Sequence, residues 1–312
     1  MTQYEQNLVV QAPAPDWFNW AIGQKGQSKR VEVKGCSIHY LAWEPDDGVA
    51  QRGGILFVHG GGANAHWWSH IAPFFKAGYR VASIDLSGMG DSGTRDEYNA
   101  TLRAEEIRAV IEDADLGPKT YLVGHSFGGF MSMRYAALYG DSLAGLVIAD
   151  SPLYPPGEDE GQRARANPMG AIRVYPTFEE AVARFRLRPR QPCDNDYIVE
   201  YIARHSIKAM KSGAGKGGWI WKFDTNAMSG RRFAEPFHEH LAAANCPSAL
   251  FIAAESALVT DEMAAYTHGL MGPGAPLVVI PAAHHHLILD QPLAFVAALR
   301  TQLEAWERSG KR

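Results

Sequence analysis

The stretch that decides the fold reads Thr120-Tyr-Leu-Val-Gly-His-Ser126-Phe-Gly-Gly129. Its apolar first half predicts a buried strand, and residues 128–139 predict a helix. Glycines two positions before and two positions after Ser126 leave room for a sharp turn between the two elements. Such a turn holds a serine hydroxyl out of the fold, where a base can take its proton. We therefore expect a nucleophilic serine here, with an ordinary glycine-rich turn as the alternative.

Five further apolar runs resemble this strand, and each ends in or next to a polar residue, glycine or proline. Runs of this kind are typical of strands buried on both faces of a parallel sheet. Helical segments lie between them, and this alternation predicts an α/β fold with a mostly parallel, doubly wound sheet. A hairpin over 30–43 precedes it. The runs cover 54–59, 79–85, 144–150, 248–254 and 277–281, and the helices cover 67–77, 101–115, 128–139 and 292–308.

Length and composition narrow the class of protein. A chain of 312 residues with 46% hydrophobic residues can bury a large core. Its net charge of -4 argues against a nucleic-acid partner. The three cysteines match no zinc spacing, and no apolar stretch reaches the roughly 18 residues that span a bilayer. We expect a cytoplasmic protein with reduced thiols, no membrane partner, and a monomeric or homodimeric state.

One segment breaks the rhythm of strands and helices. Residues 152–235 hold no clear buried strand, and prolines interrupt an arginine-rich sequence there. We predict a helical cap, or lid, over the edge of the sheet where ligands bind, with 1–151 and 236–312 as the core. From Leu153 to Pro236 there are 14 basic and 10 acidic residues, so this segment carries +4 and the remainder -8. A solvated surface is the simpler interpretation, and a preference for carboxylate-bearing substrates is the alternative.

A hydroxyl nucleophile needs a base, an acid that orients the base, and donors for an oxyanion. Successive glycines in His59-Gly-Gly-Gly62 free backbone N–H groups to face a negative charge, and the N–H of Phe127 is the second donor. Three adjacent histidines, His284 to His286, are candidate bases. Neighbours in sequence point in different directions, so we expect no metal site there. Asp150 ends a predicted strand and is either the acid or the start of a turn.

Taken together, nearly the whole chain resembles the α/β-hydrolase superfamily, and most of all its capped esterase-type members. The oxyanion loop is matched by residues 59–62 and the nucleophile elbow by the turn at Ser126. The family's D-x-x-G-x-G-x-S loop is similar to Asp85-Leu-Ser-Gly-Met-Gly-Asp-Ser92, and its histidine segment is similar to residues 281–292. These segments occur in the family's order, which is more specific than any one of them.

The resemblance implies which histidine and which acid act. The family's histidine lies four residues after one proline and seven before another, and both Pro281 and Pro292 point to His285. The acid most often follows the strand 248–254, but this chain has Ala254-Glu-Ser-Ala257 there. Some relatives place the acid at the position of Asp150, which we therefore expect, with Glu255 as the alternative. A serine nucleophile excludes the dehalogenase and epoxide-hydrolase branches, which use aspartate.

The resemblance thus implies a serine hydrolase that cleaves a carboxylic ester of a small molecule through an acyl-enzyme. Ser126, His285 and Asp150 would form the triad, without any cofactor. The alternatives are a C–C bond hydrolase of meta-cleavage-type keto acids and a small-molecule receptor without catalysis. The expected oxyanion donors are Gly61, Gly62 and Phe127. The expected pocket residues are His66, Trp67, Trp219 and Trp221.

Overall fold

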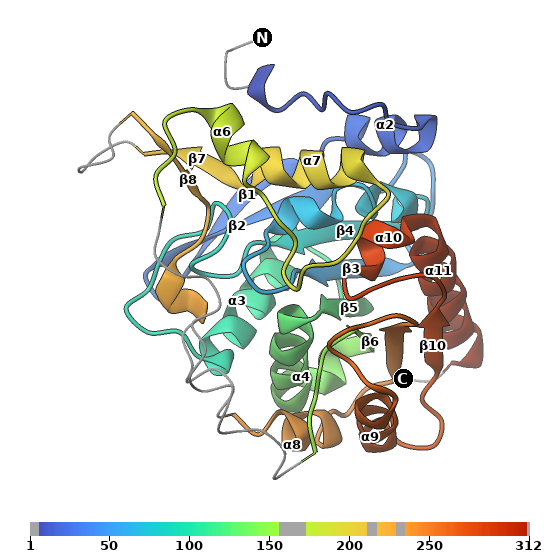
Figure 1. Cartoon of the computed structure of the whole chain (residues 1–312). Helices are drawn as coiled ribbons and strands as arrows, with labels where there is room; N and C mark the ends of the chain where they lie inside the picture. The colour runs from blue at the N-terminus through green and yellow to red at the C-terminus, as the bar shows by residue number, and fades with distance from the viewer. Residues whose placement is uncertain (1–5, 156–172, 211–216, 229–234, 311–312) are drawn as a thin grey trace.

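A computed structural model of the chain describes residues 6–155, 173–210, 217–228 and 235–310. Its centre is an eight-stranded sheet with the order β1-β2-β4-β3-β5-β6-β9-β10 (Figure 1). The pairs β1–β2 and β2–β4 are antiparallel, and the remaining neighbours are parallel. The strands are β1 (Gln27–Val33), β2 (Cys36–Trp43), β3 (Gly53–Val58), β4 (Tyr79–Ile84), β5 (Thr120–His125), β6 (Leu143–Ala149), β9 (Ser248–Ala253) and β10 (Leu277–Ile280).

The central strands are apolar throughout because helices cover both faces of the sheet. In β3, Leu56 and Val58 enter the core on one face, and Ile55 and Phe57 enter the core on the other. The first face is covered by α3 (Ala100–Asp113), α4 (Phe127–Tyr139), α8 (Phe237–Ala242) and α9 (Asp261–Met271). The second is covered by α2 (Asp16–Gly23), α10 (Leu287–Asp290) and α11 (Pro292–Ser309). This confirms the predicted α/β fold with a doubly wound, mostly parallel sheet.

One predicted helix is wrong. Residues 67–77 do not form a helix but two short 3-10 turns, η1 (Ala65–Trp68) and η2 (Ala72–Phe75). The backbone N–H of Ala65 donates to the Asp85 carboxylate, and Pro73 has no N–H to continue a helical ladder. The other predicted strands and helices agree with the structure to within three residues at each end. The helices α8, α9 and α10 were not predicted, because each is short or weakly patterned.

The segment between β6 and α8 contains α6 (Phe178–Ala183), α7 (Asp196–His205), the short strands β7 (Ile207–Ala209) and β8 (Trp219–Trp221), and η4 (Thr225–Met228). The β7–β8 pair was not predicted, because three-residue strands carry no readable alternation. Residues 156–172, 211–216 and 229–234 of this predicted cap lie outside the described part of the chain. Among the described helices, none is long and apolar enough to cross a lipid bilayer.

Candidate active site

Ser126 is the single residue between the end of β5 and the start of α4. Its backbone has φ 53° and ψ -118°, a conformation that side-chain-bearing residues rarely adopt and that is kept at functional sites. The flanking glycines make this turn possible. A Cβ on Gly128 would lie 2.4 Å from the Val58 carbonyl oxygen, and one on Gly124 would lie 2.5 Å from the Ser132 hydroxyl. The backbone of β3 and the first turn of α4 therefore approach the elbow as closely as the expected Gly-x-Ser-x-Gly pattern requires.

His285 follows β10 and is buried beside this serine. Its Nε2 lies 3.0 Å from Ser126 Oγ, and its Nδ1 lies 2.8 Å from Asp150 Oδ2. A carboxylate only accepts hydrogen bonds, so Nδ1 carries the proton and donates it to Asp150. The lone pair on Nε2 then faces the serine hydroxyl. The structure thus brings the three residues expected at the centre of the site into one hydrogen-bonded row.

Asp150 is the carboxylate that His285 contacts, and Glu255 is not. Asp150 follows β6 and is fully buried, and its Oδ1 also accepts the Ala253 N–H at 2.9 Å. Glu255 has a side chain that is 58% exposed, and its carboxylate lies 3.4 Å from His284 instead. The Ser256 hydroxyl donates to Asp150 Oδ2 at 2.7 Å, a contact that sequence reasoning missed. Its sequence signal was its place just after β9, where the family more often holds its acid.

Two further histidines pack against His285. The Nε2 of His125 donates to the His285 carbonyl at 2.8 Å, and that of His286 donates to the Arg188 carbonyl at 3.1 Å. Burial, with a smaller contribution from His285, lowers the pKa of His125 to about 3 and lowers the pKa of His286 well below its usual value. Both rings therefore stay neutral near neutral pH. They add no positive charge beside the base.

Metal-ligating side chains come close together at two places in the described chain. One ring nitrogen each from His125, His285 and His286 lie within 4.8 Å of one another, and His39, Asp85 and Asp91 form a second such group. The first group differs from the three adjacent histidines considered from sequence, because His284 turns away to Asp290. The hydrogen bonds above account for both ring nitrogens of His285 and for one ring nitrogen each of His125 and His286. The expectation of a site without metal stays a prediction.

The glycine loop after β3 borders the same cavity as Ser126. Gly61, Gly62 and Phe127 all line it. Gly62 has φ +71°, a conformation that glycine adopts without a Cβ penalty. The N–H groups of Gly61 and Gly62 donate to no backbone carbonyl of the described residues. The three residues therefore lie on the wall of the cavity that Ser126 lines, and their role as oxyanion donors stays a prediction.

A cavity of about 710 Å³ opens beside Ser126 and His285. Of the four aromatic residues expected to line it, Trp67 and Trp221 do so. The prediction is wrong for His66 and Trp219, which are not among the described residues that line the cavity. His66 packs against His205 with ring centroids 4.2 Å apart, because the η1 turn directs it toward α7. Trp219 packs against Phe178, because only the end of β8 reaches the cavity.

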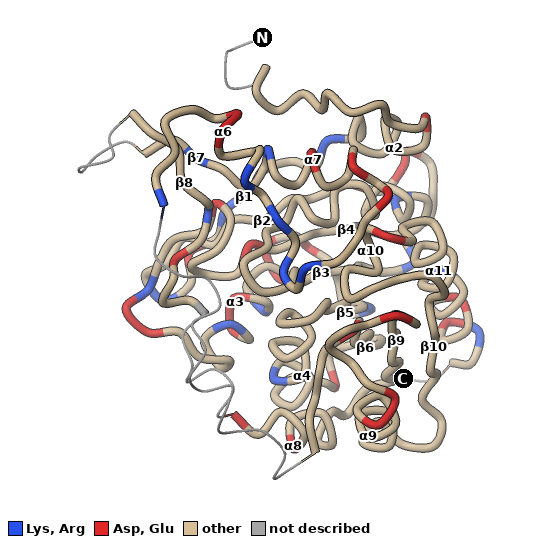
Figure 2. Tube along the Cα trace, in the orientation of Figure 1, with Lys and Arg blue, Asp and Glu red and all other residues tan. Residues whose placement is uncertain are grey.

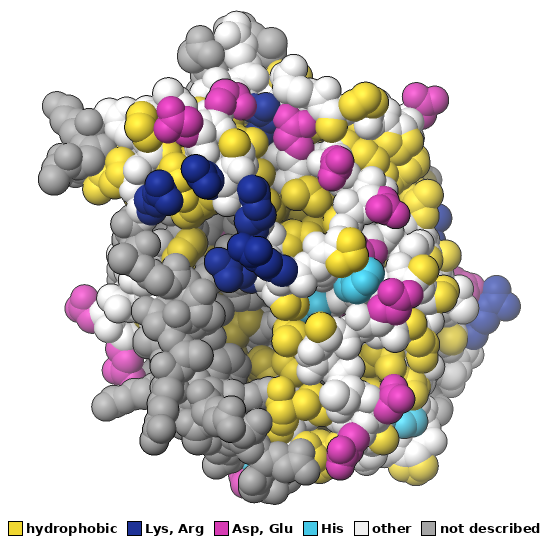
Figure 3. Space-filling view, viewed as in Figure 1, with side chains coloured by type: hydrophobic (Ala, Val, Ile, Leu, Met, Phe, Trp, Pro, Cys, Tyr) yellow, Lys and Arg dark blue, Asp and Glu magenta, His cyan; other side chains and the backbone are white. Residues whose placement is uncertain are grey.

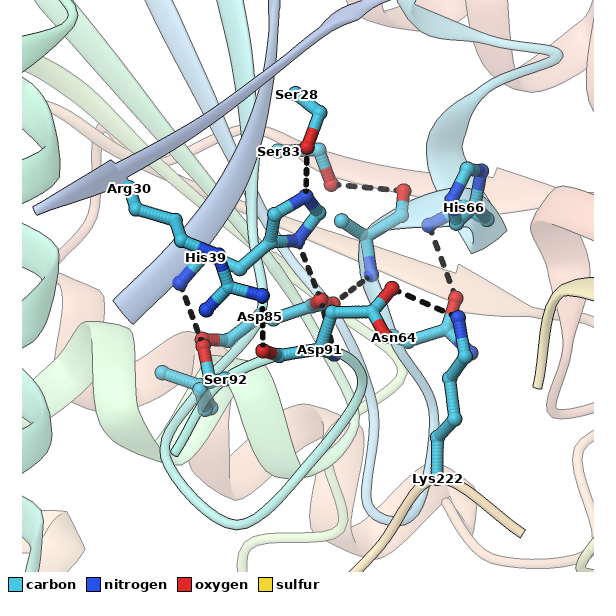
Figure 4. A network of polar contacts seen from close by, with 12 residues as sticks. Ser28, Arg30, His39, Asn64, His66, Ser83, Asp85, Asp91, Ser92 and Lys222 are labelled. Atoms are coloured by element: carbon cyan, nitrogen blue, oxygen red, sulfur yellow. Dashed lines mark hydrogen bonds and ion pairs between the residues drawn. The ribbon is translucent and has the colours of Figure 1, made fainter. Parts of the chain in front are cut away.

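Behind the glycine loop, the buried Asp85 carboxylate organises a polar network (Figure 4). It accepts from His39 Nδ1 at 2.7 Å, from the Ala65 N–H at 2.5 Å and from the Asp91 N–H at 2.8 Å. Lys222, which follows β8, donates to Asp91 at 2.7 Å. The network therefore ties the start of η1 and the described residues 217–228 to the end of β4. Its sequence signal was the loop Asp85–Ser92.

Comparisons with known proteins agree with this fold. A family model described as the alpha/beta hydrolase family matches residues 55–299. The chain is 27% identical to Esterase Rv0045c of Mycobacterium tuberculosis over 296 aligned residues. The alignment covers 90% of this chain and 92% of that protein. It is 32% identical over 126 residues to a 2-hydroxy-6-oxononadienedioate/2-hydroxy-6-oxononatrienedioate hydrolase of Comamonas testosteroni, or 38% of this chain and 42% of that protein. The crystal structure of an E-2-(acetamidomethylene)succinate hydrolase matches with a TM-score of 0.74 at 22% identity, covering 88% of this chain and 98% of that one. The chain therefore belongs to the alpha/beta hydrolase family, as a hydrolase built on the α/β fold.

Proposed function

We propose that the protein is a serine hydrolase that cleaves a carboxylic ester of a small molecule through an acyl-enzyme intermediate. One observation carries the proposal: Ser126 Oγ, the His285 imidazole and the buried Asp150 carboxylate form a continuous hydrogen-bonded row at the wall of a cavity. A serine hydroxyl becomes a nucleophile when a neighbouring base takes its proton in this way. The full-length similarity to a protein named as an esterase supports the same reaction class.

In the proposed first step, Ser126 Oγ attacks the ester carbonyl while His285 Nε2 takes the hydroxyl proton. The imidazolium that forms keeps its Nδ1–H on Asp150, whose negative charge stabilises it. His285 then gives the proton to the departing alcohol, and the acyl group stays on Ser126. A water molecule, deprotonated by the same nitrogen, attacks the acyl-enzyme, releases the carboxylic acid and restores the serine.

The negative charge that develops on the carbonyl oxygen of the ester needs hydrogen-bond donors that point at that oxygen. We assign this role to the N–H groups of Phe127 and Gly61, with Gly62 as a further donor. Loss of one such donor typically costs about 10²–10³ in rate, so the geometry of the glycine loop matters nearly as much as the triad. The Asp85 network holds the residues that follow this loop and so limits its movement.

We also propose that residues 152–235 act as a cap that sets substrate choice. The described part of this segment supplies Tyr175, Phe185 and Trp221 to the wall of the cavity that Ser126 also lines. Aromatic side chains there would surround the apolar part of an ester, which is how small-molecule pockets bury most of their ligand. Side chains from the core would then carry the chemistry, and those from the cap would select the substrate.

The test is hydrolysis of p-nitrophenyl butyrate together with labelling by a fluorophosphonate. The wild-type protein should hydrolyse the ester and take up one label per chain at Ser126, and Ser126→Ala should lose both. Ser142→Ala, in the 3-10 turn Gly140–Ser142 that follows α4, is the matched control and should keep both. A Ser126→Ala variant that keeps its hydrolytic rate, or a wild-type protein labelled only elsewhere, would contradict the proposal.

A second candidate is a C–C bond hydrolase acting on a vinylogous keto acid. The relative from Comamonas testosteroni, which is named for such a dioate substrate, favours it over part of the chain. The same triad would serve both reactions. Turnover of a ring-cleavage keto acid with a higher kcat/KM than that of p-nitrophenyl butyrate would select this candidate.

A further inference from the structure

The Arg, Lys, Asp and Glu side chains that line the cavity, among the described residues, are all positively charged. Its lining includes five basic residues and, within the described part of the chain, no aspartate or glutamate. Figure 3 shows basic side chains gathered on this face beside hydrophobic ones. The five are Arg173, Arg184, Arg186, Arg188 and Lys222.

Three of these cations have partners, and the described residues offer none to the other two. Lys222 is paired with Asp91, Arg186 donates to the carbonyls of Ala183 and Phe185, and Arg173 lies over the Tyr175 ring. The guanidinium groups of Arg184 and Arg188 form no hydrogen bond or ion pair with any described residue. Glu180 shares a smaller neighbouring pocket with Arg184, but the two form no ion pair.

The backbone holds these two arginines at the mouth of the cavity. Residues 184–188 read Arg-Phe-Arg-Leu-Arg, with the arginines exposed and Leu187 buried. Figure 2 shows these basic positions along the connection that leaves α6. The Arg188 carbonyl accepts from His286 Nε2 at 3.1 Å, and Phe185 packs on Trp221. The loop that carries Arg184 and Arg188 is thus bound to His286, the neighbour of His285.

From this arrangement we infer that the preferred substrate is an ester or thioester bearing an anionic group, carboxylate or phosphate, which Arg184 and Arg188 bind at the cavity mouth. The planar guanidinium fork matches both oxyanions and is weakly hydrated, so its unused donors bind such groups well. Apolar walls strengthen this attraction, because they exclude the water that would otherwise screen it. The inference rests on the proposed function and names its substrate class.

Two matched substrate pairs test it. The first compares the p-nitrophenyl monoester of adipic acid with p-nitrophenyl hexanoate, which has the same chain length without the carboxylate. The second compares hexanoyl-coenzyme A with the neutral thioester hexanoyl-N-acetylcysteamine. Rates are corrected with Ser126→Ala. At low salt we expect kcat/KM to favour the anionic member of at least one pair by about tenfold or more, and the pair that responds identifies carboxylate or phosphate as the group bound.

The variants distinguish specific binding by Arg184 and Arg188 from a general effect of positive charge on the protein. Arg184→Gln combined with Arg188→Gln should lower the anionic-to-neutral ratio of kcat/KM about tenfold, and 0.5 M NaCl should lower it in the wild type. Arg190→Gln removes one positive charge, half of what the double variant removes, from an exposed residue of the same loop that does not line the cavity. It should leave the ratio unchanged.

Three outcomes decide the inference. A ratio near one for both pairs would overturn it, and so would an equal loss in Arg190→Gln. Ser126-dependent hydrolysis of the neutral esters would in those cases leave the proposed function standing. If no ester or thioester is hydrolysed in a Ser126-dependent way, the proposed function fails as well.

Discussion

Replacing Asp150 by asparagine should disable the proposed base while leaving the fold intact. Three donors converge on this carboxylate: the Ala253 N–H on Oδ1, and the His285 Nδ1–H and Ser256 hydroxyl on Oδ2. An asparagine offers one oxygen and one NH₂ group in the same volume. The Ala253 N–H belongs to the end of β9 and cannot turn away, so it keeps the amide oxygen. The NH₂ group then faces His285.

The size of the effect follows from the change of tautomer. Facing a donor, His285 Nδ1 must accept, so the ring proton moves to Nε2 and points at Ser126 Oγ. An imidazole in this form cannot take the serine proton. The same exchange in serine proteases lowers kcat by about 10⁴, which corresponds to roughly 5 kcal/mol of transition-state stabilisation. We expect a similar loss of kcat for p-nitrophenyl butyrate, with KM little changed.

Two variants serve as comparisons in the same assay. Ser256→Ala removes one hydrogen bond to a charged group, worth about 1.5–3 kcal/mol at most, so kcat should fall by roughly tenfold. Glu255→Gln, at the alternative acid, should stay within about twofold of the wild type. Circular dichroism and thermal melting establish that each variant is folded. An Asp150→Asn enzyme within tenfold of the wild type, or a larger loss in Glu255→Gln, would refute the reasoning.

Three further predictions concern stability and cofactors. Burial lowers the pKa of His70 and His205 to about 4 and of His125 to about 3, so the unfolded chain takes up protons near pH 6.5 and the folded chain does not. Stability should therefore fall as the pH drops from 6.5 toward 4, by about 4 kcal/mol at pH 5.5 if each histidine costs about 1.4 kcal/mol. Urea midpoints at pH 7.5 and 5.5 measure this, and equal midpoints would contradict it. In the same urea assay, Gly128→Ala should lower the free energy of unfolding by about 1–3 kcal/mol or more, because the added Cβ would clash with backbone atoms. Gly23→Ala should not lower it, because a Cβ on Gly23 would have no atom within 4 Å. Hydrolysis should survive dialysis against EDTA, because no proposed step uses a metal; a loss restored by Zn²⁺ would contradict it.

Much of the fold could be predicted because its signals are local. Continuous apolar runs such as β3 and β5 mark strands covered on both faces, and the glycines around Ser126 mark a turn that only small residues allow. The helix expected over 67–77 was wrong for two reasons: Pro73 interrupts it, which is a local signal, and Asp85 contacts the turn before it, which is not. The Asp85 carboxylate, at the end of β4, takes the Ala65 N–H and favours a tight turn.

The candidate site divides in the same way. The chain alone indicated the nucleophile elbow and the glycine loop, because each belongs to a short pattern with its own geometric requirement. The resemblance to the α/β-hydrolase superfamily singled out the histidine, by its distance from two prolines. The choice between Asp150 and Glu255 needed the folded molecule, since both precede His285 and both follow a strand. Strand register and burial decide between them. Asp150 directly follows β6 and contacts the His285 ring. The turn after β9 supplies the Ser256 hydroxyl to the Asp150 carboxylate, while the Glu255 side chain is exposed. The same holds for the cavity wall, which Trp67 and Trp221 reach and His66 and Trp219 do not. Which side chains meet across long sequence separations is set by packing, and no single segment encodes it.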